Sequence, residues 1–261
     1  MMFLVTGSTC YGFGGQWKQI VLVGICVAFL ALGGFYIDYY FDRQKDKISG
    51  KTLNPIATGK ISKRTGILLI IIGCLVSGVI GLLIDPMILL PWLLVILVII
   101  GMAQGFLDTP ILRAISLGVL QGLYVIIGGI ASGNFNFGVL LIALFLLFAM
   151  TGGRVMGDVR DLPHDIKANT LTIPQKYGLV WAKIFLLINE IVAYIVAISV
   201  YWIGAFSIGY FYCMLLMVII GIILNIIFII RTTPRIADIT NKLSLGVLGM
   251  LYVLGMILGR K

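Results

Sequence analysis

Long apolar runs, separated by short segments that carry charge, glycine or proline, dominate the chain. A helix rises about 1.5 Å per residue, so roughly 20 apolar residues cross the hydrocarbon core of a bilayer. Runs such as LLPWLLVILVIIG are apolar on every side, which excludes the alternating strands of an outer-membrane barrel. We therefore expect an all-α, polytopic membrane helix bundle that forms one domain over residues 1–261. The predicted helices, of which the first is short, cover residues 1–14, 17–41, 65–84, 87–106, 111–131, 137–156, 179–203, 208–230 and 239–259.

Composition and charge fit this class. Hydrophobic residues make up 61% of the chain and charged residues 11%, which excludes an ordinary soluble domain. The net charge of +9 does not indicate a nucleic-acid partner, because the basic residues lie in loops between apolar spans. If the connections after spans two, four, six and eight share one side, only Lys18, Arg260 and Lys261 lie opposite. Cationic loops cross membranes poorly, so we place the charged loops in the cytoplasm. The spacings Gly101/Gly105 and Gly118/Gly122 would allow close helix contacts.

Six of the ten acidic residues form two clusters at the ends of the second and sixth spans: Asp38, Asp42 and Asp46, then Asp158, Asp161 and Asp165. At 100° per residue each cluster lies on one helix face, so both can face one cavity. Oxygen ligands without His or Cys suit Mg²⁺, which commonly bridges one or two carboxylates to a substrate phosphate. The alternative is a solvated helix end whose aspartates only pair with neighbouring Lys and Arg. Two clusters in matching positions favour a functional site.

The two acidic segments also belong to a weak internal repeat. A shift of 119 residues superposes Asp42 on Asp161, Asp46 on Asp165, Pro55 on Pro174 and Gly59 on Gly178. Each segment runs from a carboxylate stripe through a polar, cation-bearing stretch to a proline and then a glycine. Two stripes facing each other across a pseudo-symmetric bundle would hold a diphosphate between their metal ions.

The stretches DYYFDRQKDKISGKTLNPIATGKIS (38–62) and DVRDLPHDIKANTLTIPQKYG (158–178) resemble the two motifs of the UbiA superfamily of intramembrane prenyltransferases. The resemblance implies about nine transmembrane helices with a cytoplasmic cap formed by the 2–3 and 6–7 loops. It also implies Mg²⁺ bound by both motifs, and transfer of a prenyl group from a prenyl diphosphate to an acceptor in a lateral membrane cavity. Tyr39 and Asn54 depart from the family pattern, which has Asp and Arg there, and the first helix lacks its usual cytoplasmic half.

Carried over by position, the family's metal ligands fall on Asp38, Asp42, Asp46, Asp158, Asp161 and Asp165. Arg154 lies four residues before Asp158 and thus on the same helix face, which makes it the best cation for the diphosphate. We assign the catalytic roles to Asp42, Asp161 and Arg154. Further cations that we expect at the diphosphate are Arg43, Lys47, Lys51, Arg113 and Lys167. For these cations a solvated, positive-inside role is an equal alternative.

The acceptor is not readable from the chain. A lipid such as geranylgeranylglyceryl phosphate, an aromatic acid, and a haem or carotenoid precursor all remain open, with ether-lipid or quinone-type synthesis favoured and geranylgeranyl diphosphate as a candidate donor. Glu190 lies in the middle of span seven and could accept a proton or bind a polar group of the acceptor, but the more common use of such a residue is a hydrogen bond to another helix. A secondary transporter also has internal repeats and membrane acids, but it does not need a chelating pattern at one face. A CDP-alcohol phosphotransferase would carry an Asp-Gly-x-x-Ala-Arg segment that the chain lacks.

Overall fold

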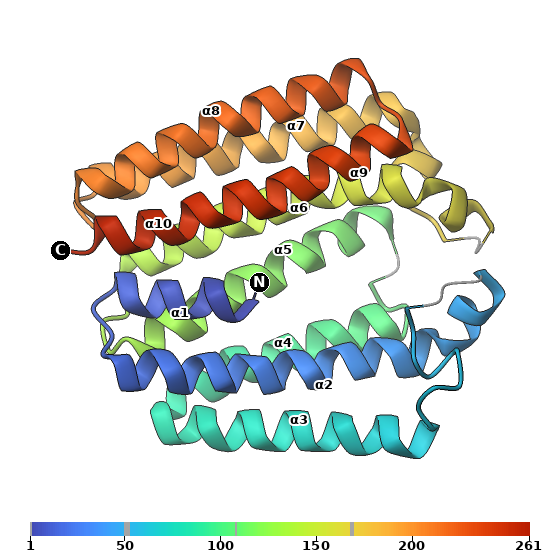
Figure 1. Cartoon of the computed structure of the whole chain (residues 1–261), viewed down its shortest axis with the longest axis horizontal. Helices are drawn as coiled ribbons and strands as arrows, with labels where there is room; N and C mark the ends of the chain where they lie inside the picture. The colour runs from blue at the N-terminus through green and yellow to red at the C-terminus, as the bar shows by residue number, and fades with distance from the viewer. Residues whose placement is uncertain (1, 50–52, 108, 168–169) are drawn as a thin grey trace.

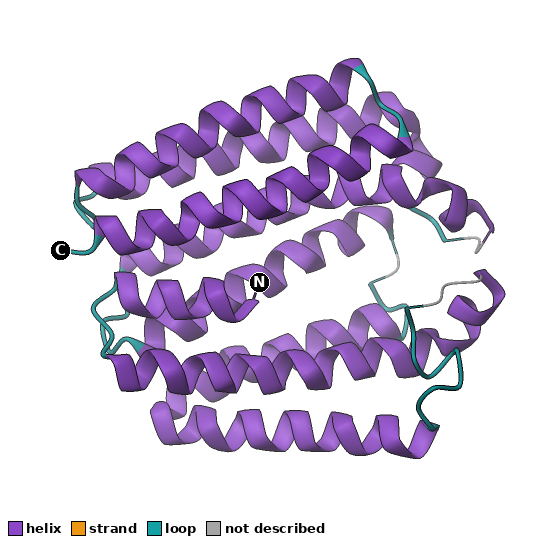
Figure 2. Cartoon of the chain, in the orientation of Figure 1, coloured by secondary structure: helices purple, strands orange, loops and turns teal. Residues whose placement is uncertain are grey.

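The computed structural model describes residues 2–49, 53–107, 109–167 and 170–261, and these residues form helices and loops without strands (Figures 1 and 2). This confirms the predicted all-α bundle. A 3₁₀ turn, Pro86–Ile88, precedes α4, and a π-helical turn, Ser244–Leu248, joins α9 to α10. The helices are α1 Met2–Gly12, α2 Trp17–Ser49, α3 Lys63–Ile84, α4 Leu89–Ala103, α5 Pro110–Ala131, α6 Phe137–Lys167, α7 Ile173–Trp202, α8 Ile208–Ile230, α9 Pro234–Leu243 and α10 Gly249–Gly259.

Eight helical segments in the described residues are long and apolar enough to cross a membrane, with α9, the π-helical turn and α10 counted as one segment. The one predicted helix that is not among these eight segments is the first, α1, whose 11 residues span only about 16 Å. The helices lie side by side, and α2, α4, α6 and α8 all end at the same end of the bundle (Figure 1). The structure therefore places the four charged connections at one end, as the charge pattern predicted.

Both helices that carry the acidic clusters are longer than a membrane requires. Helix α2 has 33 residues and α6 has 31, so each extends about 45–50 Å, against a hydrocarbon core of about 30 Å. They continue well past the predicted ends at residues 41 and 156. Asp38 lies 21 residues after Trp17, and Asp158 lies 21 residues after Phe137. The two clusters therefore sit at the same depth, on polar continuations of the membrane helices.

The backbone supports the repeat at its glycines. Gly59 has φ +75° and Gly178 has φ +83°, a conformation that glycine adopts without strain. Gly178 interrupts α7, so the first turns of α7 form a separate segment after Pro174. The predicted cap formed by the 2–3 and 6–7 loops stays a prediction, because residues 50–52 and 168–169 lie outside the described residues.

Helix α5 is largely buried in the centre of the bundle and packs closely on α6. A Cβ at Gly118 would lie 2.2 Å from the Leu147 carbonyl oxygen, and one at Gly122 would lie 3.1 Å from that of Ala143. These contacts confirm the close approach predicted for this glycine pair. The same prediction for Gly101/Gly105 is wrong, because α4 ends at Ala103 and Gly105 occupies a turn with φ +82°.

Candidate active site

A cavity of about 780 Å³, here called the polar cavity, opens at the end of the bundle where α2 and α6 finish. Its walls come from α2, from the end of α4 and the turn after it, and from α5 and α6. Among the described residues, the charged side chains lining it are Asp38, Asp42, Lys45, Arg113, Arg154 and Lys167. Two carboxylates thus share one cavity with four cations. A site of this composition can bind a polyanion together with a metal cation.

Helix geometry places the two carboxylates. Asp38 and Asp42 are four residues apart on α2, so they project from successive turns of one face. Both are partly buried, and the charge of Asp42 acts directly on Asp38. Neighbouring carboxylates repel each other, so a cation that binds between them lowers the electrostatic free energy of this face of α2.

Asp46, one turn further along, is held by the following loop. The Asn54 side-chain amide donates to Asp46 Oδ2 at 2.9 Å and to the Tyr39 carbonyl oxygen at 2.9 Å. Its Oδ1 accepts from the backbone N–H groups of Ile56 and Ala57 at 3.0 and 3.1 Å. Asn54 is 1% exposed. The residue that departs from the family motif therefore fixes the third aspartate of the first cluster.

Two arginines connect the clusters. Arg154 Nε donates to Asp158 Oδ1 at 2.8 Å, so the two side chains share the helix face that their i, i+4 spacing predicted, and Arg154 also lines the polar cavity. Arg113, near the start of α5, lines the same cavity. The charges of both arginines act on Asp38 and on Asp158. Arg113 and Arg154 thus lie between the acidic stripe of α2 and that of α6.

The second cluster contributes to the cavity through cations rather than through its own carboxylates. Asp158 is 3% exposed and Asp165 is 7% exposed. Asp161 accepts two hydrogen bonds from the Arg160 guanidinium, at 2.8 and 2.7 Å. These three acids are not among the described residues that line the polar cavity, whereas Arg154 and Lys167 of the same helix are.

The other predicted cations lie elsewhere. Arg43 donates to the Tyr40 carbonyl oxygen, and its guanidinium lies 4.5 Å from the centre of the Tyr40 ring. In the described part of the chain, neither Arg43 nor Lys47 lines the polar cavity, and Lys51 lies outside the described residues. Lys45 lines it without having been predicted. Its spacing, seven residues after Asp38 and three after Asp42, would have indicated the shared face.

The carboxylates fit magnesium bound together with a substrate. Among the described residues, no group of three or more His, Cys, Asp or Glu side chains could hold a metal ion by itself. Mg²⁺ usually takes one or two protein carboxylates and fills its octahedron with water and phosphate oxygens. Asp38 and Asp42, on adjacent turns and facing arginines, supply this type of ligand set.

A helix bundle of this length, with carboxylates and arginines around one cavity at its polar end, defines a polytopic membrane protein whose cavity can bind a polyanion together with a metal cation. The model of the UbiA prenyltransferase family matches residues 1–246, and the chain belongs to this family. It is 30% identical over 213 residues to digeranylgeranylglyceryl phosphate synthase of Methanosphaera stadtmanae, covering 81% of this chain and 74% of that protein.

Solved structures share the fold. A structure of digeranylgeranylglyceryl phosphate synthase superposes with a TM-score of 0.81 at 22% identity, covering 99% of this chain and 92% of that one. A UbiA homologue from Archaeoglobus fulgidus, bound to GPP and Mg²⁺, superposes with a TM-score of 0.77 at 19% identity, covering 98% and 94% of the two chains. The bundle described above is therefore the fold of this family.

Proposed function

We propose that the chain catalyses the Mg²⁺-dependent transfer of a prenyl group from a prenyl diphosphate to a glyceryl phosphate lipid in the membrane, with release of diphosphate. Family membership supports the reaction class, and the similarity to digeranylgeranylglyceryl phosphate synthases supports the acceptor class. The observation that carries the proposal is the polar cavity, in which Asp38 and Asp42 face Arg113, Arg154 and Lys167. This arrangement matches the charges of a magnesium diphosphate.

The reaction breaks the bond between C1 of the prenyl group and the diphosphate oxygen. Negative charge develops on the leaving diphosphate, and fixed cations stabilise it in a partly buried site. Arg154 is held for this task by Asp158, and Arg113 approaches from α5. Magnesium, when bound, neutralises part of the diphosphate charge. We assign its binding to Asp38 and Asp42 of the first cluster and to Asp161 and Asp165 of the second, with Asp46 and Asp158 bound directly or through water.

The donor and the sidedness follow from the same considerations. We infer geranylgeranyl diphosphate as the donor and geranylgeranylglyceryl phosphate as the acceptor, because the matched relatives carry the name of a digeranylgeranylglyceryl phosphate synthase. The basic connections lie at the end of the bundle that holds the polar cavity. From the positive-inside rule we infer that this cavity lies at the cytoplasmic surface.

Purified protein in lipid nanodiscs tests the proposal. The assay supplies Mg²⁺ and geranylgeranyl diphosphate with one of two acceptors, geranylgeranylglyceryl phosphate or 4-hydroxybenzoate, and separates the products by mass spectrometry. We expect a diether product only with the glyceryl lipid, loss of product with EDTA, and recovery when excess Mg²⁺ is added.

The variant Asp42→Asn keeps the side-chain shape but removes a charge that binds the metal. We expect kcat/KM for the donor to fall by at least about 100-fold, the usual scale for losing one electrostatic contact at a reacting centre. Asp85→Asn is the matched control, because Asp85 follows the end of α3 that is remote from the polar cavity. The amide oxygen of asparagine would still accept the hydrogen bond from the Met87 N–H. Wild-type turnover in Asp42→Asn, or prenylation of the aromatic acid alone, would contradict the proposal.

A further inference from the structure

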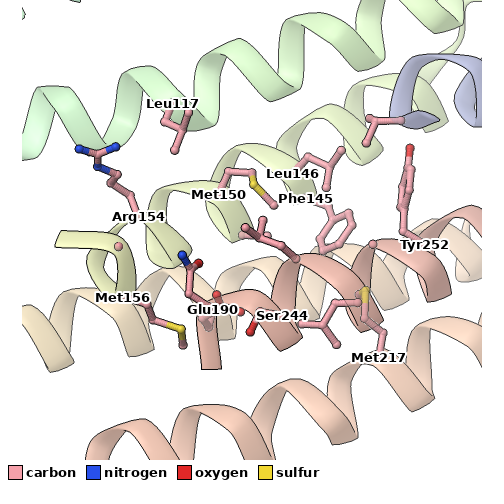
Figure 3. Close-up of a pocket in the computed structure, with 18 of the residues that line it drawn as sticks. Leu117, Phe145, Leu146, Met150, Arg154, Met156, Glu190, Met217, Ser244 and Tyr252 are labelled. Atoms are coloured by element: carbon pink, nitrogen blue, oxygen red, sulfur yellow. The ribbon is translucent and has the colours of Figure 1, made fainter. Parts of the chain in front are cut away.

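A smaller cavity, here called the inner cavity, lies deeper in the bundle and has a volume of about 180 Å³ (Figure 3). Arg154 lies at one end of it and Tyr252 at the other, with the apolar side chains of Leu146 and Met150 between them. Arg154 also lines the polar cavity, so the two cavities adjoin at this side chain. The inner cavity therefore continues the diphosphate site toward the middle of the bundle.

Glu190 is the only acidic side chain among the described residues that line the inner cavity. It is 8% exposed and belongs to the apolar part of α7. A Cβ at Gly152 of α6 would lie 3.2 Å from Glu190 Oε1, and Arg154 follows two residues later. The carboxylate thus lies beside the helical turn that leads into the arginine. An ionisable group at this depth is costly and commonly marks a functional site.

The hydrogen bond described for Glu190 orients its carboxylate and joins it to a residue of its own helix, α7, rather than to another helix. The Tyr194 hydroxyl donates to the Glu190 carboxylate, and both residues belong to α7. The same hydroxyl accepts from Asn225 Nδ2 of α8 at 3.1 Å, and Gly221 leaves it space, since a Cβ there would lie 2.2 Å from it. The Tyr194–Asn225 bond, together with the bond from the Tyr210 hydroxyl of α8 to the Ala197 carbonyl oxygen of α7 at 3.0 Å, links these two helices. A packing role for Glu190 does not account for its carboxylate.

The π-helical turn Ser244–Leu248 also lines the inner cavity, through Ser244, Leu245 and Leu248. Such turns widen a helix locally and occur frequently at functional sites. Cavities that hold a whole small ligand have volumes of about 300–1,000 Å³. The inner cavity is below that range, so it fits one end of a substrate and not an entire lipid.

We infer that the inner cavity receives the hydroxyl end of the acceptor and that Glu190 accepts the proton of that hydroxyl. This inference rests on the proposed function. The hydroxyl oxygen forms a bond to C1 of the prenyl group, while the bond between C1 and the diphosphate oxygen breaks and its electron pair leaves with diphosphate. The hydroxyl proton passes to the Glu190 carboxylate and later to water. A base is required because an aliphatic alcohol keeps its proton at neutral pH.

Three variants test this role in the nanodisc assay with Mg²⁺, geranylgeranyl diphosphate and geranylgeranylglyceryl phosphate. Glu190→Gln keeps the shape and still accepts from Tyr194, and we expect its kcat to fall by at least about 100-fold, within the usual range for a lost general base. Glu190→Asp should recover part of that rate, although it fits the space less well than glutamine. Ser199→Ala, which removes a polar group from α7 away from both cavities, is the control and should turn over at the wild-type rate.

Measurements of donor binding and of the acceptor KM distinguish a loss of catalysis from a loss of folding in Glu190→Gln. We expect Glu190→Gln to bind geranylgeranyl diphosphate with Mg²⁺ as tightly as the wild type, and its KM for the acceptor to stay within about threefold, since the charge is needed only as the proton moves. An unchanged kcat in Glu190→Gln, a Glu190→Asp variant slower than Glu190→Gln, or loss of donor binding would each overturn the inference. A wild-type protein that prenylates no glyceryl lipid overturns the proposed function and this inference together, and that failure is visible without any variant.

Discussion

Asn54 makes four hydrogen bonds with one side-chain amide, and these join α2, Asp46 and the loop that follows. In the sequence this residue is visible only as a departure from a motif that has arginine. Spacing along the chain does not show that the loop folds back onto α2, so its contact with Asp46 was not predictable. The buried amide gives Asp46 a neutral donor and leaves the neutralisation of the cavity's anions to Arg113, Arg154, Lys45 and Lys167.

We expect Asn54→Ala to weaken magnesium binding. The substitution removes the hydrogen bond that Asn54 donates to Asp46, and it removes the acceptor of the Ile56 and Ala57 N–H groups, at a cost of about 1–3 kcal/mol for each buried group left unsatisfied. The loop should loosen, and the Mg²⁺ concentration for half-maximal turnover should rise by about tenfold or more. Titration of turnover with Mg²⁺ measures this change.

Thr58→Val is the control for the Asn54 prediction. It removes a hydroxyl that donates to the Asn54 carbonyl oxygen but leaves the side-chain amide of Asn54 in place. The magnesium dependence of this variant should match that of the wild type. If Asn54→Ala also titrates as the wild type does, the amide does not position Asp46 for the metal site.

The hydrophobic pattern predicts the helix boundaries well at one end of the bundle and poorly at the other. The predicted and observed helices agree within a few residues at the end opposite the polar cavity, where apolar runs are bounded by glycine, asparagine, serine or aspartate. At the cavity end, α2 and α6 continue through polar sequence, and α7 and α9 begin earlier than predicted. The length of an apolar run matches the thickness of the hydrocarbon core. Where a helix continues beyond that core its residues are polar, so hydropathy does not show the continuation. The helical extensions that carry the aspartates were therefore predicted only from the spacing of these residues by three or four positions.

The close packing of α5 on α6 gives a stability prediction. A Cβ at Gly118 would lie 2.2 Å from the Leu147 carbonyl oxygen and 2.3 Å from Thr151 Oγ1. We therefore expect Gly118→Ala to push the helices apart and to destabilise the protein by about 1–3 kcal/mol, as overpacking usually does. Thermal unfolding in detergent, followed by intrinsic fluorescence, should show a lower Tm.

The matched substitution is Gly24→Ala on α2, where a Cβ meets no heavy atom within 4 Å. Alanine is the better helix former by about 1 kcal/mol, so this variant should keep or raise the Tm. Equal Tm values for Gly118→Ala and Gly24→Ala would show that the two helices do not approach as closely as described.

At the scale of the whole molecule, two helical hairpins, α2 with α3 and α6 with α7, present equivalent sequence segments at one end of the bundle. The repeat predicted this convergence, since equivalent helices begin and end on the same sides. The repeat did not predict how the second cluster would contribute to the polar cavity. Arg154 donates a hydrogen bond to the Asp158 carboxylate, and Arg160 donates to that of Asp161. Such pairings depend on which rotamers the neighbouring helices allow, and the linear sequence does not contain that information.

Moving cationic loops across a membrane is unfavourable, and the connections at the cavity end together with the adjoining helix ends carry 16 of the 19 Lys and Arg residues of the chain. The orientation that this asymmetry implies can be tested with cysteines at two exposed loop positions, Lys60→Cys beside α3 and Asn134→Cys between α5 and α6. Each is introduced into a protein whose four native cysteines are replaced by alanine. In intact cells a membrane-impermeant maleimide should label Asn134→Cys, and it should label Lys60→Cys only after the membrane is opened. Labelling in the reverse order would place the polar cavity on the outer surface, away from the cytoplasmic supply of prenyl diphosphate that the proposed reaction requires.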